Sequence, residues 1–102
     1  MLISEFIYHI TTQSQWEDAL KKGSYKADTL ATEGFVHCST EEQMPGVLER
    51  YYKNKTDLLQ LTIQKDRLTS LLLFELSPSI NQEFPHIYGS INLDAVVIVT
   101  KI

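Results

Sequence analysis

Patterns of apolar and polar residues divide the chain into short strands and helices. A run of β-branched and aromatic residues at 6–10 predicts a first strand, and 34–38 predicts a second. Apolar and polar residues alternate over 59–64, which is typical of a half-buried strand. The more uniformly apolar run 71–76 predicts a buried strand. The β-branched run within 93–100 predicts a strand in the middle of a sheet.

Two segments carry apolar residues at helical spacing instead. Thr12 and Gln15 form a capping box, in which hydroxyl and amide groups satisfy free N–H groups at a helix start, and Gly23 is a natural stop. Between these signals one helical face is apolar: Trp16, Ala19 and Leu20. A second apolar face follows the 34–38 strand: Met44, Val47, Leu48, Tyr51 and Tyr52. Pro45 near its start fits the first turn of a helix, where a missing N–H costs least.

The order of these elements indicates the fold class. Strand, helix, strand and helix come first, followed by at least three strands, while 78–85 lies between two prolines and is predicted to be mostly loop. A series of strands after early helices favours an α+β fold over a regularly alternating parallel sheet. A chain of 102 residues has room for one domain, which we place at 1–102.

Composition narrows the classes of partner. Nine basic and thirteen acidic residues leave a net charge of −4, which makes nucleic-acid binding unlikely because such binding depends on Lys and Arg at phosphates. The single cysteine, Cys38, cannot form an internal disulfide and fits a reducing compartment. No signal-like N-terminus is apparent, and the longest apolar run, 95–99, is too short for a membrane span. We therefore expect a soluble cytoplasmic protein without membrane contact.

All three histidines lie in or beside predicted strands, among apolar and aromatic residues. Because side chains alternate along a strand, His37 and Ser39 share one face of the second strand, whereas Cys38 points to the other. If the first two strands are neighbours, about 4.8 Å apart, His9 and His37 lie in one cleft and Cys38 faces the packed interior. The alternative is that each histidine, His86 included, is a core or edge residue with one satisfied hydrogen bond.

Metal binding and cysteine catalysis are weaker hypotheses. His37 and Cys38 are adjacent in a strand and point apart, and the chain has no CxxC or HxxxH spacing. We therefore predict no metal site. Cys38 is expected to act as a small buried apolar residue and not as a nucleophile.

The segment 84–89 (FPHIYG) is a third candidate for chemistry. A proline keeps its predecessor extended, and Gly89 permits a sharp turn or the close approach of a ligand. The segment is predicted as a loop that presents His86 and Tyr88 just before the last strand, an arrangement suited to a flat polar small molecule. A well-packed loop with a hydrogen-bonded tyrosine is the alternative.

These motifs together resemble a known family. The segments 33–40 (EGFVHCST) and 84–89 (FPHIYG), in this order, with 7–10 (IYHI) and 92–97 (NLDAVV), resemble the bacterial domain-of-unknown-function family numbered 952. The resemblance covers essentially the whole chain. It implies a fold similar to that of ADP-ribosyltransferases, with a split, strongly bent β core and short helices around a cleft for a nicotinamide dinucleotide.

The same resemblance implies roles for individual residues. His9 matches a histidine on the first core strand of those enzymes, and His37, followed by Ser39, matches their second-strand motif. Those enzymes hold the ribose with a late glutamate, whereas this chain offers His86 and Tyr88 in the corresponding region. The resemblance thus implies an inherited cleft with absent or altered transfer chemistry.

Our leading hypothesis is an ADP-ribosyltransferase-like cleft that binds a nucleotide or NAD, with ADP-ribosyl or related transfer as the candidate activity. The expected catalytic residues are His37 and His86, the latter as acid or base because imidazole titrates near neutral pH. The expected ligand-binding residues are His9, Ser39, Tyr88 and Gly89. NAD is the one cofactor that the resemblance suggests. A non-catalytic module for a small molecule or a protein, and a plain structural domain, are the alternatives.

Overall fold

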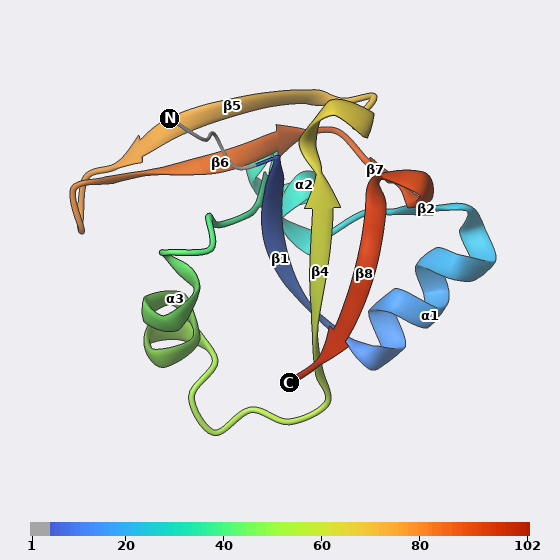
Figure 1. The fold of residues 1–102 in the computed structure, drawn as a ribbon, viewed down its shortest axis with the longest axis horizontal. Coiled ribbons are helices and arrows are strands. Elements are labelled where there is room, and N and C mark those ends of the chain that lie inside the picture. Colours follow the sequence, from blue (N-terminus) through green and yellow to red (C-terminus); the bar gives the residue numbers. More distant parts are fainter. Residues whose placement is uncertain (1–4) are drawn as a thin grey trace.

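The computed structural model describes residues 5–102, which form an α+β fold of antiparallel sheets and short helices (Figure 1). A central sheet has the strand order β1-β4-β8, formed by Phe6–Thr12, Leu58–Gln64 and Val96–Lys101. A hairpin sheet has the order β3-β6-β5, formed by Val36–His37, Gln82–Tyr88 and Leu71–Ser77. A short ribbon pairs β2 (Ser24–Tyr25) with β7 (Ile91–Asn92). The predicted α+β class and the strands at 6–10 and 59–64 are confirmed.

The central sheet buries one face of β1 and β4. Alternate residues of β1 lie opposite alternate residues of β4, and both sets are buried: Ile7, His9 and Thr11 against Ile63, Leu61 and Leu59. This arrangement follows from strand alternation, since a period of two sends every second side chain to the same face. His9 therefore lies on the buried face of the sheet, in the middle of β1.

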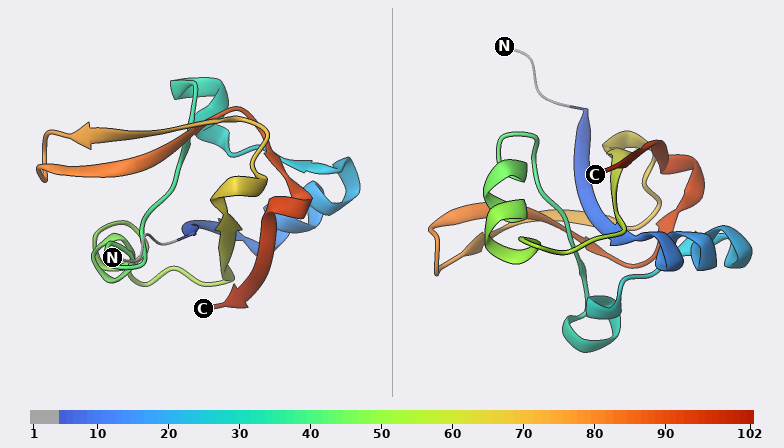
Figure 2. Two further views of the ribbon diagram at one scale, coloured as in Figure 1. Left: turned by 45° about the horizontal axis from the view of Figure 1, so that its top comes forward. Right: turned by 90° about the horizontal axis from the view of Figure 1, so that it is seen from below.

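The segment 36–39 joins the two larger sheets. Val36 and His37 pair with Ile87 and His86 of β6, and two residues later Ser39 exchanges both backbone hydrogen bonds with Tyr8 of β1, each 2.8 Å long. The chain thus passes from the hairpin sheet to the central sheet within four residues. In Figures 1 and 2 the long β5–β6 hairpin lies across the strands of the central sheet, so the β core is split into two differently directed parts.

The prediction of a loop at 78–85 is wrong for its second half. Only a tight turn separates β5 from β6, and it is closed by the backbone bond from Asn81 N–H to the Ser77 carbonyl, 2.8 Å long. Pro85 is the last residue of the segment that was predicted to be mostly loop. It is accommodated in β6 because its carbonyl, which proline retains, accepts a hydrogen bond from Cys38 N–H at 3.0 Å. The motif FPHIYG is therefore a strand, and His86 projects from it.

The positions predicted for two apolar strands are also wrong. β5 was expected to be buried, yet it is an edge strand in which Leu71 is 60% exposed and Phe74 is also exposed. β8 was expected in the middle of a sheet, but it lies at the edge of the central sheet with Ile98 55% exposed. Apolar composition shows that a strand forms, but it does not show how many neighbours the strand has.

Three α-helices occur in the part of the chain that the structure describes, besides the short 3₁₀ helices Lys65–Arg67 and Leu93–Ala95. α1 (Gln13–Lys22) begins at Thr12, whose hydroxyl accepts from Gln15 N–H, and ends at Gly23 with positive φ, as predicted. Leu20, expected on its buried face, is 55% exposed. α3 (Met44–Tyr51) is also confirmed, with Pro45 in its first turn. α2 (Asp28–Glu33) was not predicted, because six residues are too few to show helical periodicity.

Within residues 5–102, no helix has the length and apolar character that a membrane crossing requires.

Candidate functional site

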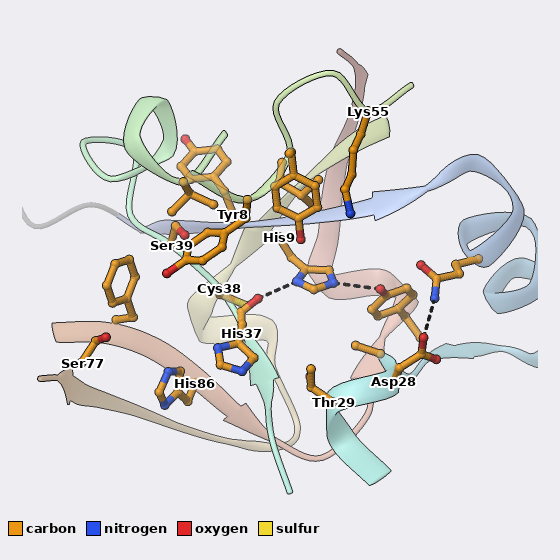
Figure 3. Close-up of a pocket in the computed structure, with 18 of the residues that line it drawn as sticks. Tyr8, His9, Asp28, Thr29, His37, Cys38, Ser39, Lys55, Ser77 and His86 are labelled. Carbon is orange, nitrogen blue, oxygen red and sulfur yellow. Dashed lines mark hydrogen bonds between the residues drawn. The ribbon is translucent and has the colours of Figure 1, made fainter. Parts of the chain in front are cut away.

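An open pocket of about 640 Å³ lies where the segment 36–39 crosses from one sheet to the other. Its walls come from β1, from the start of α2, from the C-terminal end of α3 with the residues after it, and from the far end of the β5–β6 hairpin. Figure 3 shows the side chains that line it. As strand alternation led us to expect, His9 and His37 share this pocket, and His86 and Ser39 line it as well.

His9 is engaged within the protein through both ring nitrogens. Nδ1 lies 2.6 Å from the carbonyl oxygen of His37, to which it donates, and Nε2 lies 2.8 Å from the Tyr25 hydroxyl (Figure 3). That hydroxyl is in turn 2.9 Å from Thr11 Oγ1. Burial lowers the pKa of His9 to about 4, so the ring is neutral at pH 7. In this arrangement His9 fixes β1 to the segment 36–39, and neither nitrogen is available to a ligand.

His37 and His86 face each other across the β3–β6 pair. They are directly opposite in the strand register, and their ring centroids are 5.2 Å apart. Phe35 stacks on His86 at 4.1 Å and contacts His37 at 4.8 Å. The two side chains differ in exposure, since His37 is 50% exposed and His86 only 11%.

Each of these two histidines has a carboxylate on one ring nitrogen. His37 Nε2 lies 3.0 Å from Glu33 Oε1, and His86 Nδ1 lies 2.8 Å from Glu75 Oε1. Glu75 also accepts a hydrogen bond from the Tyr88 hydroxyl. The hydrogen bonds from Tyr88 and then from His86 lower the pKa of Glu75, and the same bond to Glu75 raises the pKa of Tyr88. The structure therefore contains two carboxylate–imidazole pairs side by side.

Sequence reasoning missed the two glutamates. Glu75 interrupts the apolar run 71–76, and a charged residue within such a strand is a signal that its face meets a polar partner. Glu33 stands four residues before His37, at the end of the unpredicted α2, and nothing in the strand pattern connects the two.

Ser39 and Cys38 are both buried in the wall of the pocket. Ser39 takes part through its backbone in the bridge to Tyr8. Cys38 belongs to the apolar core, and burial raises the pKa of its thiol well above the usual range. A thiol held protonated in this way is a poor nucleophile, in line with the role expected from the sequence.

Two predicted ligand-binding residues lie outside the lining of the pocket. Tyr88 is on the same strand as His86, but its hydroxyl donates to Glu75, the carboxylate that also pairs with His86. Gly89 was expected to allow the approach of a ligand. The close approach is instead to Ser70, because a Cβ at Gly89 would lie 2.5 Å from Ser70 Oγ, and its φ of 152° also disfavours other residues.

The other side of the pocket is aromatic and carries a lysine. Tyr51 and Tyr52, predicted only as an apolar helix face, line it together with Tyr8. Lys55 lies with its ammonium group 5.9 Å from the centre of the Tyr52 ring, and Figure 3 shows it on the opposite side of His9 from His86. Asp28, near the start of α2, is the acidic residue of the lining. Among residues 5–102, no group of three or more His, Cys, Asp or Glu side chains is placed to hold a metal ion.

The geometry defines an α+β protein with a split antiparallel core and a histidine-lined pocket at the junction of its sheets. The chain belongs to the family described as "Protein of unknown function (DUF952)", whose profile matches residues 10–99.

Solved structures of one relative share this fold. The crystal structure of protein CC0527 from Caulobacter crescentus has a TM-score of 0.84 and 24% identity, and the match covers 93% of this chain and 83% of that one. The solution NMR structure of CC0527 has a TM-score of 0.82 at 23% identity, over 96% and 84% of the two chains. At this identity the likeness shows the fold alone. No curated protein matches the chain at a significant level.

Proposed function

We propose that the pocket binds a nucleotide, or a dinucleotide such as NAD. The observation that carries this proposal is the convergence of His37, His86 and Ser39 on one open pocket whose other side is tyrosine-rich. Its volume of about 640 Å³ is in the range of small-molecule sites, which are commonly about 300–1,000 Å³. Aromatic walls suit a flat base, and a few converging polar groups suit ribose and phosphate oxygens.

Different residues of the pocket would contact different parts of the nucleotide. Within the described residues, His37 Nδ1 and His86 Nε2 have no hydrogen-bonding partner, so both can reach a ligand. Lys55 supplies a fixed positive charge for a phosphate on the other side of the pocket. His9, which the sequence suggested as a direct ligand contact, instead holds the wall of the pocket in place.

The resemblance to ADP-ribosyltransferases supports a nucleotide as the ligand and ADP-ribosyl or a related group transfer as the reaction class. The paired histidines in place of a late glutamate favour the related chemistry over ADP-ribosyl transfer itself. Fold similarity is associational support, so the reaction depends on the site and its test.

Calorimetric titration with NAD, ADP-ribose and AMP tests the binding. We expect His37→Ala and His86→Ala to weaken binding about 10- to 150-fold, because a lost hydrogen bond to a charged group costs about 1.5–3 kcal/mol. Glu49→Gln is the matched control, since it removes the exposed ion pair between Glu49 of α3 and Lys53, neither of which lines the pocket. Circular dichroism checks that each variant is folded. Absence of binding to the wild type at millimolar ligand would refute the proposal.

Exposed apolar side chains support a second candidate, a non-catalytic interaction module. Leu76 lines the pocket and is exposed, and Phe74, two residues before it on the same face of β5, is exposed as well. A protein partner in the pocket would cover these residues together. Leu76→Ser would then weaken partner binding, whereas nucleotide binding would change little. The opposite result favours the nucleotide.

A further inference from the structure

The feature that goes furthest beyond ligand binding is the pairing of His37 with His86. Their rings are adjacent, both line the pocket, and each is held at one nitrogen by its own glutamate. Figure 3 shows the two imidazoles side by side at one end of the pocket. Each ring keeps a second nitrogen, Nδ1 of His37 and Nε2 of His86, with no partner among the described residues.

Two imidazoles with free nitrogens on one pocket wall can transfer two protons in a single reaction. One ring accepts a proton from the attacking group while the other gives a proton to the leaving group. A carboxylate on the far nitrogen fixes the orientation of each ring. We propose that His37 and His86 are a catalytic base and acid that hydrolyse a phosphodiester of the bound nucleotide, an inference that rests on the proposed function.

The chemistry of the leaving group favours this class of bond. A ribose oxygen leaves as an alkoxide and needs a proton, so a general acid assists its departure. Nicotinamide leaves from its glycosidic bond as a neutral molecule and needs no proton. A second imidazole would therefore have no proton to donate in that reaction. The local charge favours a diester in particular, because Glu33 and Glu75 beside the pair repel a doubly charged monoester more than a singly charged diester.

The burial of the two rings assigns their roles. His37 is half exposed and can reach a water molecule. His86 is largely buried and is bonded to Glu75, which also accepts a hydrogen bond from the Tyr88 hydroxyl. His86 is therefore assigned as the acid, because its enclosed ring is shielded from bulk water and is held in place by Glu75. Glu75 is a positioning residue, which acts through His86.

The reaction balances with water as the only co-reactant. His37 Nδ1 takes a proton from water as the water oxygen bonds to phosphorus. The bond from phosphorus to the ribose oxygen breaks, and His86 Nε2 gives its proton to that oxygen. The products are a phosphate monoester and a free hydroxyl, and one proton exchange with solvent restores each ring.

Two substrates with different leaving groups test the assignment. 2′,3′-Cyclic AMP releases a ribose oxygen that needs a proton, whereas bis(p-nitrophenyl) phosphate releases a stabilised phenolate that does not. Because general acid–base catalysis contributes about 10²- to 10⁴-fold, we expect His86→Gln to lower kcat at least about 100-fold on the cyclic nucleotide and less than about 10-fold on the phenyl ester. His37→Gln should lower kcat on both substrates. Glu49→Gln should match the wild type, and AMP should release no phosphate.

Glu75→Gln keeps both imidazoles and provides a second variant should a histidine variant fail to fold. We expect a lower kcat on the cyclic nucleotide with unchanged KM. The other titratable groups around the pair are Glu33 from α2, Tyr88 from β6 and His9 from β1, and this variant leaves them in place.

Titration of the same ligands separates failure of this inference from failure of the proposed function. Binding of 2′,3′-cyclic AMP without turnover overturns the acid–base pair but not the proposal of a nucleotide pocket. Absence of both binding and turnover overturns both. Equal losses on the two substrates in His86→Gln overturn the assignment of His86 as the acid, and turnover that survives in both histidine variants overturns the pair.

Discussion

At the scale of single residues, burial gives the three histidines different properties. His9 is enclosed between β1 and the segment 36–39, and both its nitrogens are bonded inside the protein. His37 and His86 each keep one nitrogen directed away from their glutamates. The same side chain therefore serves as a structural link in one place and as a candidate reactive group in the other two.

The buried His9 should make the protein sensitive to acid. Its pKa in the folded protein is about 4, below the ordinary value of 6.5, so the unfolded chain binds more protons between these two values. Stability from this group is complete above about pH 6.5 and is lost as the pH falls toward 4. Urea unfolding should show a loss of about 2 kcal/mol from this group between pH 7 and pH 5.

The His9→Gln variant isolates this effect. It should be less stable than the wild type at pH 7, because it loses the bonds to His37 and Tyr25. Between pH 7 and pH 5, however, its stability should decline by about 2 kcal/mol less than that of the wild type. Equal declines in the two proteins would show that His9 is not the group responsible.

The residues of the site could be predicted from the sequence only in part. Alternation along a strand placed His9 and His37 toward one cleft, and the structure shows both in the pocket. Alternation carries no information on what a ring nitrogen bonds to, so the engagement of His9 by Tyr25 was not foreseeable. The pairing of His86 with Glu75 depends on the register of β5 and β6, which only the fold determines.

At the scale of secondary-structure elements, local signals located the helix ends well and the strand environments poorly. Thr12 and Gly23 bound α1 because capping depends on nearby backbone groups. The environment of β5 and β8 depends on pairing with distant segments, and both turned out to be edges. The loop prediction at Pro85 was wrong because the effect of a proline on a strand depends on which of its backbone groups the neighbouring strand bonds to.

The turn after β6 gives a test at this scale. Gly89→Ala would bring a Cβ within 2.5 Å of Ser70 Oγ, and Ser70 is itself held by a 2.7 Å bond from Oγ to the Ser90 carbonyl. We expect a loss of about 1–3 kcal/mol in the free energy of unfolding from overpacking and backbone strain. Chemical denaturation measures it, and Ser70→Gly in the same chain should recover part of the loss.

Gly46→Ala is the matched control for this prediction. Its Cβ would lie 2.9 Å from the Arg50 guanidinium, the flexible end of a long side chain that can move away. Gly46 is in α3, where alanine is favoured over glycine by about 0.5–1 kcal/mol, so this variant should be at least as stable as the wild type. A Gly89→Ala protein as stable as Gly46→Ala would show that the turn can adapt.

At the scale of the whole molecule, the pocket lies at the junction of three parts, which are the central sheet, the hairpin sheet and α3. The hairpin sheet meets the central sheet through the segment 36–39, and α3 closes another side of the pocket. Figure 2 shows α3 and the β5–β6 hairpin as separate projections from the central sheet. A ligand in the pocket would therefore touch all three parts at once.

This position makes ligand binding measurable as thermal stability. A ligand that binds only the folded state contributes about 2.7 kcal/mol at 100 times its Kd. For a domain of about 100 residues each kcal/mol raises Tm by about 4–8 °C, so ADP-ribose or NAD at that concentration should raise Tm by about 10–20 °C. His86→Ala should show a smaller rise at the same ligand concentration, and Glu49→Gln the full rise. If calorimetry detects binding while Tm stays constant, the ligand has comparable affinity for the unfolded chain, and the folded pocket is not its site.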